Sequence, residues 1–155
     1  KASINFKPVK ANSEAHNKRV AELDYNFKEL EKDNNSYTWK DRPKTVNEAE
    51  KECRKFCKDV SGRKMMKNAE PIREAVVNLN SDHGKEDIGR LAKELEKEFG
   101  LRCFQAHVHR DEGQSKDDLN YHAHMLFQWQ DRRKEIEALQ QLSPEEYIKT
   151  LQNNK

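Results

Sequence analysis

The sequence predicts an α+β fold in which a mainly antiparallel sheet is covered by helices. The chain has 155 residues, enough for one hydrophobic core and too few for two. Four segments have the apolar pattern of β-strands, and segments of helical periodicity are interspersed with them. A polar stretch that suits a hairpin connects the last two strand segments, so antiparallel pairing is the expected arrangement.

The N-terminal segment is predicted to form a strand and then a helix. Apolar and polar residues alternate over residues 2–7, as on a half-buried strand, and Asn12 and Ser13 are suitable helix caps. The apolar stripe that follows has helical spacing and comprises Val20, Leu23, Phe27 and Leu30. His16 falls on the same stripe, so the spacing turns this side chain toward the protein body.

The middle of the chain is predicted to contain a polar loop over residues 33–42, a second helix, and a strand over residues 72–79. Thr45 and Glu48 form a capping box at the start of the helix, and Ser61-Gly62 ends it. The buried side of this helix is expected to consist of Ala49, Cys53, Phe56, Cys57 and Val60.

A third helix and two further strands follow. The helix has the stripe Ile88, Leu91, Leu95 and Phe99, and Gly100 suits the position just past its end. Residues 101–109 and 121–129 are predicted strands, with a polar loop over 110–120 between them. Residues 1–131 are expected to form the main domain. The charge pattern changes abruptly there, so residues 132–155 are predicted to be a C-terminal helical segment, consistent with a deletion near Asp131.

Composition narrows the class of protein. Hydrophobic residues make up 34% of the chain and charged residues 37%, which predicts a densely charged surface. No apolar run approaches the roughly 18 residues of a membrane span, so none is expected. The three cysteines, Cys53, Cys57 and Cys103, cannot pair fully, and they favour a reducing, cytoplasmic setting over a disulfide scaffold.

One segment is more basic than the rest. Residues 40–67 contain ten Lys or Arg against five acidic residues, while the whole chain has a net charge of only +2. Such a segment can follow the phosphates of a nucleic acid. An ordinary solvated helix face explains the same charges equally well.

Four of the six histidines lie close together as two His-x-His pairs, and they are His107, His109, His122 and His124. Side chains at positions i and i+2 of a strand point to the same face, about 6.5–7 Å apart. Imidazoles from two neighbouring strands can therefore converge on one metal ion at roughly 2.0–2.2 Å. A single pair is more often just a polar face, whereas two pairs with Asp111 and Glu112 close by predict a metal site.

Two motifs resemble those of a known family. The stretch His109-Arg110-Asp111-Glu112, followed by His122-Ala123-His124, resembles the metal motif of the MobV (Mob/Pre) relaxases, which belong to the HUH endonuclease superfamily. The stretch Ala15-His16-Asn17-Lys18-Arg19 resembles the N-terminal His-Asn-x-Arg motif of that family. The resemblance covers the chain from Ser3 to about Trp129. It implies a relaxase-like fold, related to the ferredoxin-like and RRM folds.

The resemblance also implies a chemistry. His109, His122 and His124 would bind a divalent cation, Mn²⁺ or Mg²⁺, and histidine ligands favour manganese of these two. His16 would attack the scissile phosphate and form a covalent 5′-phospho-histidine link. Glu112 or another carboxylate would hold or deprotonate that imidazole.

Further residues are assigned to nucleic-acid binding. Arg19, Asn17 and His107 are expected to contact DNA, and Arg19 would neutralise a phosphate. Tyr25, on the same predicted helix as His16, is the alternative nucleophile. The implied partners are single-stranded or supercoiled DNA at an origin of transfer and accessory mobilisation proteins.

The predicted function is therefore a relaxase that nicks one DNA strand for the mobilisation of a plasmid or mobile element. Two alternatives stay open: a metal-dependent phosphodiesterase without covalent capture, and a non-catalytic DNA-binding module. The sequence also departs from the family, because residues 113–121 form a longer polar insertion than the usual Thr-Pro link before the His-x-His pair.

Overall fold

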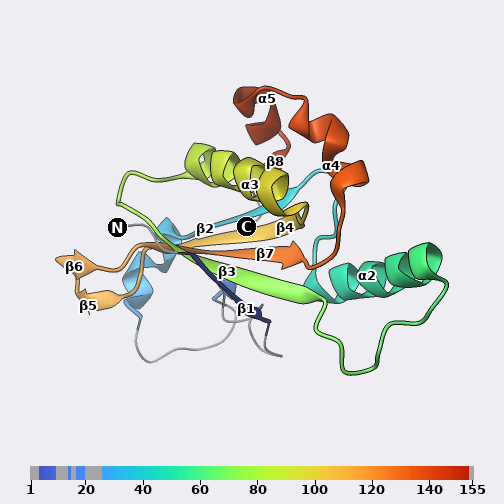
Figure 1. Cartoon of the computed structure of the whole chain (residues 1–155). Helices are drawn as coiled ribbons and strands as arrows, with labels where there is room; N and C mark the ends of the chain where they lie inside the picture. Colours follow the sequence, from blue (N-terminus) through green and yellow to red (C-terminus); the bar gives the residue numbers. More distant parts are fainter. Residues whose placement is uncertain (1–3, 10–13, 15–16, 20–25, 154–155) are drawn as a thin grey trace.

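A six-stranded sheet organises the computed structural model of the chain (Figure 1), which describes residues 4–9, 14, 17–19 and 26–153. The strand order is β1-β3-β7-β4-β2-β8, and every neighbouring pair is antiparallel. The strands are β1 (Ile4–Pro8), β2 (Asn35–Trp39), β3 (Ile72–Asn78), β4 (Arg102–His109), β7 (His122–Gln128) and β8 (Leu151–Asn153). The predicted α+β class with a mainly antiparallel sheet is confirmed.

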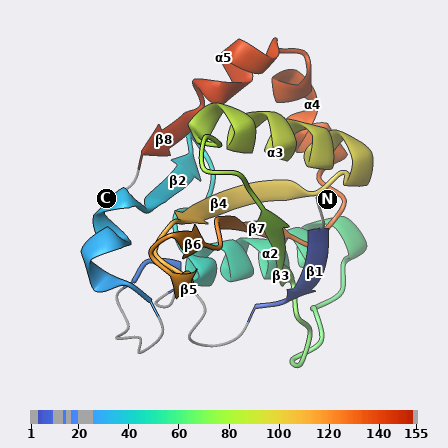
Figure 2. The same cartoon turned by 90° about the vertical axis from the view of Figure 1, so that its left-hand side faces the viewer.

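Helices cover both faces of the sheet (Figures 1 and 2). On one face lies α3 (Lys85–Phe99), with α4 (Arg133–Gln140) and α5 (Pro144–Ile148) beside it, and on the other lies α2 (Val46–Ser61). A short 3₁₀ helix, η1 (Lys28–Asp33), and a hairpin of β5 (Gly113–Ser115) and β6 (Asp118–Leu119) complete the described elements. None of the helices in the described part of the chain has the length and apolar character needed to cross a membrane.

The two central strands, β4 and β7, are buried along almost their whole length. Ala123, Met125 and Phe127 belong to the large core cluster together with residues of α3. The intervening residues of β7 point to the opposite face, because side chains alternate along a strand. There Leu126 packs with Ala49 and Cys53 of α2. The position of His122 and His124 on that second face follows from the same alternation.

The ends of the long helices follow the sequence signals. The hydroxyl oxygen of Thr45 accepts a hydrogen bond from the backbone N–H of Glu48 at 3.1 Å, which caps α2. Gly62 and Gly100, just past α2 and α3, have φ angles of 73° and 69°. This left-handed region favours glycine, so the predicted ends of both helices are confirmed.

The predicted buried stripe of α2 is too long. Ala49 and Cys53 are the buried residues of this helix, whereas Val60 is 71% exposed. The reason is that β7 ends at Gln128, and the backbone of Ala49 and Cys53 already receives hydrogen bonds from Gln128 and Gln130. The second half of α2 therefore extends beyond the sheet (Figure 1).

The prediction of a loop over residues 33–42 is wrong, because β2 lies within it. Tyr37 and Trp39 are buried in the core on the α3 side. Asn35 and Ser36 make the strand look polar in the sequence, yet β2 pairs with β4 on one side and β8 on the other.

The predicted helix does not continue through Phe27 and Leu30. Phe27 has an extended backbone, and Leu30 belongs to η1. Val20 and Leu23, on the same predicted stripe, lie outside the described residues. The predicted loop over residues 110–120 contains the β5–β6 hairpin.

The residues after Asp131 pack against the rest of the chain. β8 pairs with β2, and Tyr147 of α5 is completely buried. The hydroxyl of Tyr147 accepts a hydrogen bond from the indole N–H of Trp39 at 3.1 Å and itself donates to Glu96 of α3. Glu96 also accepts a hydrogen bond from Arg42 at 2.5 Å. The C-terminal segment thus contributes a strand and a buried polar contact to the same core.

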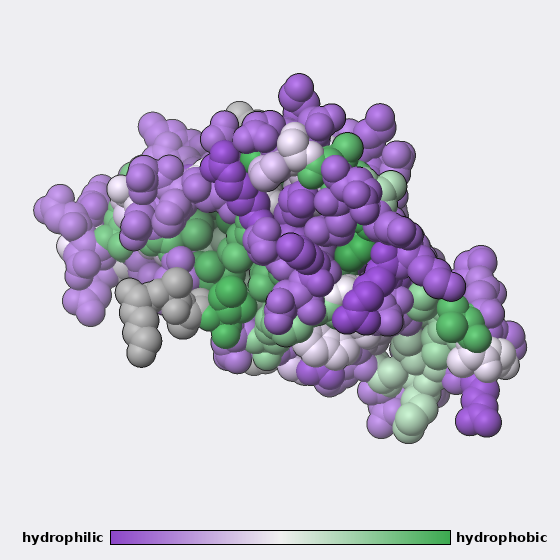
Figure 3. All heavy atoms as spheres, turned by 45° about the horizontal axis from the view of Figure 1, so that its top comes forward, coloured by the Kyte–Doolittle hydropathy of each residue, from purple (hydrophilic) through white to green (hydrophobic). Residues whose placement is uncertain are grey.

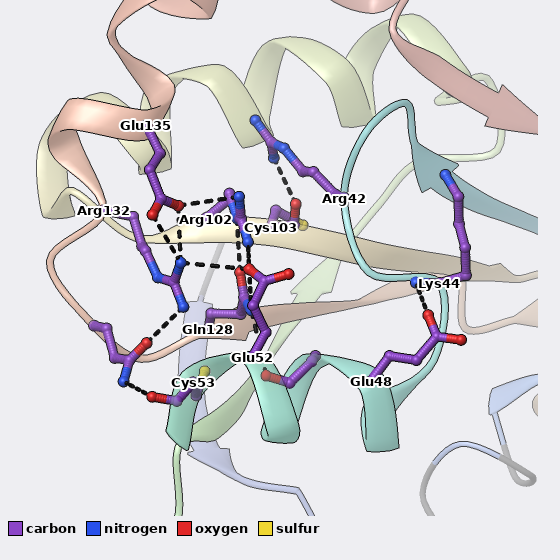
Figure 4. A network of polar contacts seen from close by, with 12 residues as sticks. Arg42, Lys44, Glu48, Glu52, Cys53, Arg102, Cys103, Gln128, Arg132 and Glu135 are labelled. Atoms are coloured by element: carbon purple, nitrogen blue, oxygen red, sulfur yellow. Dashed lines mark hydrogen bonds and ion pairs between the residues drawn. The ribbon is translucent and has the colours of Figure 1, made fainter. Parts of the chain in front are cut away.

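A second polar network holds α2 and α4 to one end of the sheet (Figure 4). Glu52 of α2 forms an ion pair with Arg102 of β4 and accepts hydrogen bonds from Gln128 at 3.2 Å and Arg132 at 3.4 Å. Arg132 also contacts Glu135 of α4 at 2.8 Å. Arg102 and Gln128 pair in the register at this end, whereas His109 and His122 pair at the opposite end of the same two strands.

Candidate metal centre

Three histidines meet on the same face of the sheet as α2, at the end of β4 and β7 that lies away from this helix. In the register of β4 and β7, His109 lies opposite His122. Their ring centroids are 5.3 Å apart, and the ring of His124 lies 4.8 Å from His109 and 5.0 Å from His122. All three residues are buried. The predicted convergence of these side chains agrees with the structure.

The spacing of the ring nitrogens fits a metal ion. One nitrogen from each ring lies within 4.8 Å of the other two. Three atoms at such separations lie no more than about 2.8 Å from a common point, near the roughly 2.0–2.2 Å of metal–imidazole bonds. Small rotations of the rings would therefore be sufficient to bind a cation.

Each imidazole is oriented by a second contact. Nε2 of His109 donates to the backbone oxygen of Asn17 at 2.7 Å, and Nδ1 of His122 donates to the backbone oxygen of Asn120 at 2.9 Å. Nδ1 of His124 donates to the carboxylate of Glu74. Because carbonyls and carboxylates only accept, these contacts determine which nitrogen carries the hydrogen in a neutral ring. In a neutral ring the lone pair then lies on Nδ1 of His109 and on Nε2 of His122 and His124, which is the usual tautomer of metal-binding histidines.

The carboxylate of Glu112 borders two of those nitrogens. Its Oε2 atom lies 3.5 Å from Nδ1 of His109 and 3.3 Å from Nε2 of His122. Burial by itself raises the pKa of Glu112, but its polar contacts with His109, His122 and Arg19 outweigh that effect and lower the pKa far below its usual range. An ionised carboxylate thus lies next to the three imidazoles.

Asp111 and Arg19 form a buried ion pair beside the site. Nε and Nη2 of Arg19 donate to the two carboxylate oxygens of Asp111, each at 2.8 Å, and Nη2 also donates to Glu112 at 2.5 Å. Asn26 donates to Asp111 at 2.9 Å. The Arg19 side chain is 5% exposed, and its contact with a DNA phosphate stays a prediction. Arg19 positions the acidic pair.

The N-terminal motif is only partly described. Asn17 is buried and contacts the centre through its carbonyl, which is different from the predicted contact with DNA. His16 and Tyr25, the two candidate nucleophiles, lie outside the described residues.

His107 lies on the same face but not at the centre. It pairs with His124 in the register and is 1% exposed. Its Nδ1 lies 2.8 Å from the hydroxyl of Ser36, and its Nε2 donates to the side-chain oxygen of Gln105 at 3.0 Å. Burial lowers the pKa of His107 well below its ordinary value. The contact of His107 with nucleic acid stays a prediction.

Glu74 is the site residue that the sequence interpretation missed. It lies on β3, is 3% exposed, and binds His124. A signal was present in the sequence, because Glu74 precedes the apolar run Ala75-Val76-Val77 of a predicted strand. A carboxylate inside such a strand needs a polar partner.

Comparison with known proteins gives similarity at the level of structure. No protein-family model matches the chain, and no curated protein matches it. Among solved structures, the chain is similar to the MobM relaxase domain (MOBV; Mob_Pre) bound to oriT DNA of plasmid pMV158, in two Mn-bound crystal structures.

Both alignments cover most of this chain at low sequence identity. The first, at pH 4.6, has 24% identity and a TM-score of 0.51, and covers 81% of this chain and 69% of the relaxase domain. The second, at pH 6.8, has 20% identity and a TM-score of 0.53, and covers 96% of this chain and 85% of the relaxase domain. The predicted relaxase-like architecture is thereby confirmed, and the chain has the fold of the MOBV (Mob_Pre) relaxase domain.

Proposed function

We propose that this chain is a metal-dependent DNA relaxase, which nicks one strand at an origin of transfer by transesterification. The observation that carries the proposal is the orientation of His109, His122 and His124. Each ring has one nitrogen that binds a carbonyl or a carboxylate, and one ring nitrogen from each residue lies within 4.8 Å of the other two. This arrangement occurs in a fold shared with a relaxase domain that binds manganese and oriT DNA.

The three imidazoles would hold the cation, and Glu112 would be an additional ligand or would orient His109 and His122. Nitrogen ligands favour Mn²⁺ over Mg²⁺. The bound cation would polarise a non-bridging oxygen of the scissile phosphate and stabilise the charge that develops there.

His16 is the proposed nucleophile. A lone pair of its imidazole would form a bond to phosphorus, the bond from phosphorus to the 3′ oxygen would break, and that oxygen would leave as a 3′-hydroxyl after gaining a proton. Glu112 or another carboxylate would take the imidazole proton. The next residue, Asn17, contacts His109 through its backbone, which supports a nucleophile beside the centre. Retention of the 5′ end in a covalent link conserves the energy needed to rejoin the strand.

The first testable prediction concerns this covalent link. Supercoiled plasmid carrying the oriT sequence of the chain's own genetic element is incubated with Mn²⁺ and the protein, and the products are separated on denaturing gels. The wild-type protein should remain attached to the nicked 5′ end. The His16→Ala variant should lose the adduct and still bind the DNA, because only the attacking group is removed.

His83→Ala is the matched control, because His83 lies in the turn that precedes α3. It should form the adduct like the wild type. A free 5′-phosphate would indicate the phosphodiesterase instead, and bound but uncut DNA would indicate the non-catalytic module. An unchanged adduct in His16→Ala would move the nucleophile elsewhere, with Tyr25 as the next candidate.

A further inference from the structure

We propose that residues 54–67, which we call the basic arm, bind the phosphodiester backbone of DNA at a distance from the metal centre. The arm comprises the second half of α2 and the loop that follows it. The inference rests on the proposed function, because it extends the DNA that the same protein would nick.

The arm contains most of the unbalanced positive charge. It has six Lys or Arg residues and one acidic residue, Asp59, which gives a local charge of +5. The whole chain has a net charge of +2, so the remaining residues together have a charge of −3. A polyanion approaching this molecule would therefore be attracted mainly to the arm.

The charges of the arm are available to a ligand. Lys58, Arg63, Lys64 and Lys67 are exposed, and their side chains form no ion pair with any residue that the structure describes. Arg54 and Lys55 differ, because Arg54 pairs with Glu50 at 3.1 Å and Lys55 pairs with Asp59 at 2.6 Å. Lys58 lies on α2, and Arg63, Lys64 and Lys67 lie in the loop that follows it. Four neighbouring exposed cations without an acidic partner among the described residues favour an external anion.

The loop of the arm is held against the helix. Arg54 donates to the backbone oxygens of Met66 at 3.2 Å and Lys67 at 3.4 Å. Between helix and loop lies a groove of about 690 Å³, whose lining includes Lys58, Lys64 and Lys67. Asp59 also lines this groove. The three lysines thus border one hollow of a loop that is hydrogen-bonded to the helix, and less conformational entropy is lost on binding than for lysines on a free loop.

The position of the arm sets the length of DNA involved. The histidines lie at one end of β7, and α2 is anchored at the other end through Gln130 and Cys53. The distance from the metal centre to the end of the arm has two parts. The first, along β7 from His124 to Gln128, is about 13 Å at ~3.3 Å per residue. The path along α2 from Cys53 to Ser61 adds about 12 Å at 1.5 Å per residue. The arm projects at this end of the molecule (Figures 1 and 3), so it would contact DNA up to roughly seven base pairs from the centre, at ~3.4 Å per base pair.

A protein partner is less suited to this surface. Val60 and Met66 are each 71% exposed and would be suitable for a protein contact. However, lysine is depleted in protein–protein interfaces, and burying several unpaired lysines would be costly. Phosphates along a DNA backbone neutralise such a cluster directly.

The test compares two triple variants of the full chain. The first is Lys58→Ala/Lys64→Ala/Lys67→Ala in the arm. The matched control is Arg90→Ala/Lys97→Ala/Lys134→Ala, which removes the same charge from exposed positions on α3 and α4. The probe is a fluorescent duplex of about 20 base pairs and arbitrary sequence, roughly 68 Å long at ~3.4 Å per base pair. Its affinity is measured without metal at several salt concentrations.

The arm variant should bind at least about tenfold more weakly at low salt, and its plot of log K against log salt should be shallower by about three, or one per lysine. The control should change the slope by less than about one. An unchanged slope in the arm variant, or equal losses in both variants, would overturn the proposal. Equal melting temperatures of the two variants establish that both are folded.

The same arm variant separates this inference from the proposed function. It should bind Mn²⁺ like the wild type, and it should form the covalent adduct normally on an oligonucleotide too short to reach the arm. If the wild type forms no adduct but the arm variant still loses the salt slope, the nicking proposal alone fails. If the adduct forms and the slope is unchanged, the inference about the arm alone fails.

Discussion

The three imidazoles of the centre differ in what holds them. Backbone carbonyls orient His109 and His122, so their second contacts depend on the main chain. His124 is oriented by the carboxylate of Glu74. Of these three contacts, only the one with Glu74 involves the side chain of the partner. A single substitution of that partner can therefore change it without altering the backbone.

Glu74→Gln should weaken the binding of Mn²⁺ by about 10- to 100-fold, as is usual when a carboxylate partner of a metal-binding histidine is lost. The neutral amide can still accept a hydrogen bond, but it no longer increases the basicity of the ring. Isothermal titration calorimetry with Mn²⁺ at neutral pH measures the change.

Glu94→Gln is the matched control, because it makes the same substitution at an exposed position on α3. It should bind Mn²⁺ with wild-type affinity. Equal affinities of Glu74→Gln and the wild type would mean that His124 is not a ligand or that Glu74 does not tune it.

Arg19 illustrates a limit of sequence interpretation at the scale of residues. The motif places an arginine near a phosphate site, and the charge alone does not reveal what it binds. In the structure, Asp111 is 0% exposed and lies 92 residues away in sequence, and its two carboxylate oxygens bind Nε and Nη2 of the guanidinium. Buried carboxylates require such partners, so the burial of Asp111 explains an arginine at this position without a phosphate.

At the scale of elements, the most accurate predictions were the strands with strong alternation. β4 and β7 alternate between the apolar core and the histidines, so the pattern predicted both the strands and the shared face of the ligands. β2 was missed because Asn35 and Ser36 begin it and its burial depends on β8. Strand order depends on such long-range pairs, which have no local pattern.

The contact between α3 and α5 leads to the next prediction. Glu96→Ala should lower the free energy of unfolding by about 3–5 kcal/mol, because the buried Arg42 would lose the carboxylate that balances its charge. The hydroxyl of Tyr147 and the backbone N–H of Cys103 would lose the same acceptor. Urea denaturation followed by circular dichroism measures this loss.

The exposed Glu98 of the same helix gives the control. Glu98→Ala should change the free energy of unfolding by less than about 0.5 kcal/mol, as is usual for surface substitutions. If Glu96→Ala were equally mild, the buried cluster would not contribute to the attachment of the C-terminal segment.

At the scale of the whole molecule, the candidate metal centre and the basic arm lie at opposite ends of the sheet. The histidines occupy the end where His109 pairs with His122, and the network around Glu52 fixes α2 at the end where Arg102 pairs with Gln128. Composition predicted a basic segment over residues 40–67. Only the fold reveals that its second half extends beyond the sheet, because that depends on where β7 ends.

The division of the chain at Asp131 leads to the last prediction. In the structure, residues 133–153 supply β8 to the edge of the sheet and the buried Tyr147 to the core. Truncation after Asp131 would expose Trp39, now 0% exposed, leave Arg42 and Glu96 open to water on one side, and free the edge of β2 for aggregation.

The truncated chain should therefore lose cooperative unfolding or aggregate, and Mn²⁺ binding should weaken with it, because β2 lies next to the strand that holds His109. Thermal unfolding monitored by circular dichroism, together with size-exclusion chromatography, measures both effects. A monomer that unfolds cooperatively, with a stability within about 1 kcal/mol of the full chain, would instead support an independent catalytic domain over residues 1–131, because single domains of this size typically unfold in one cooperative transition.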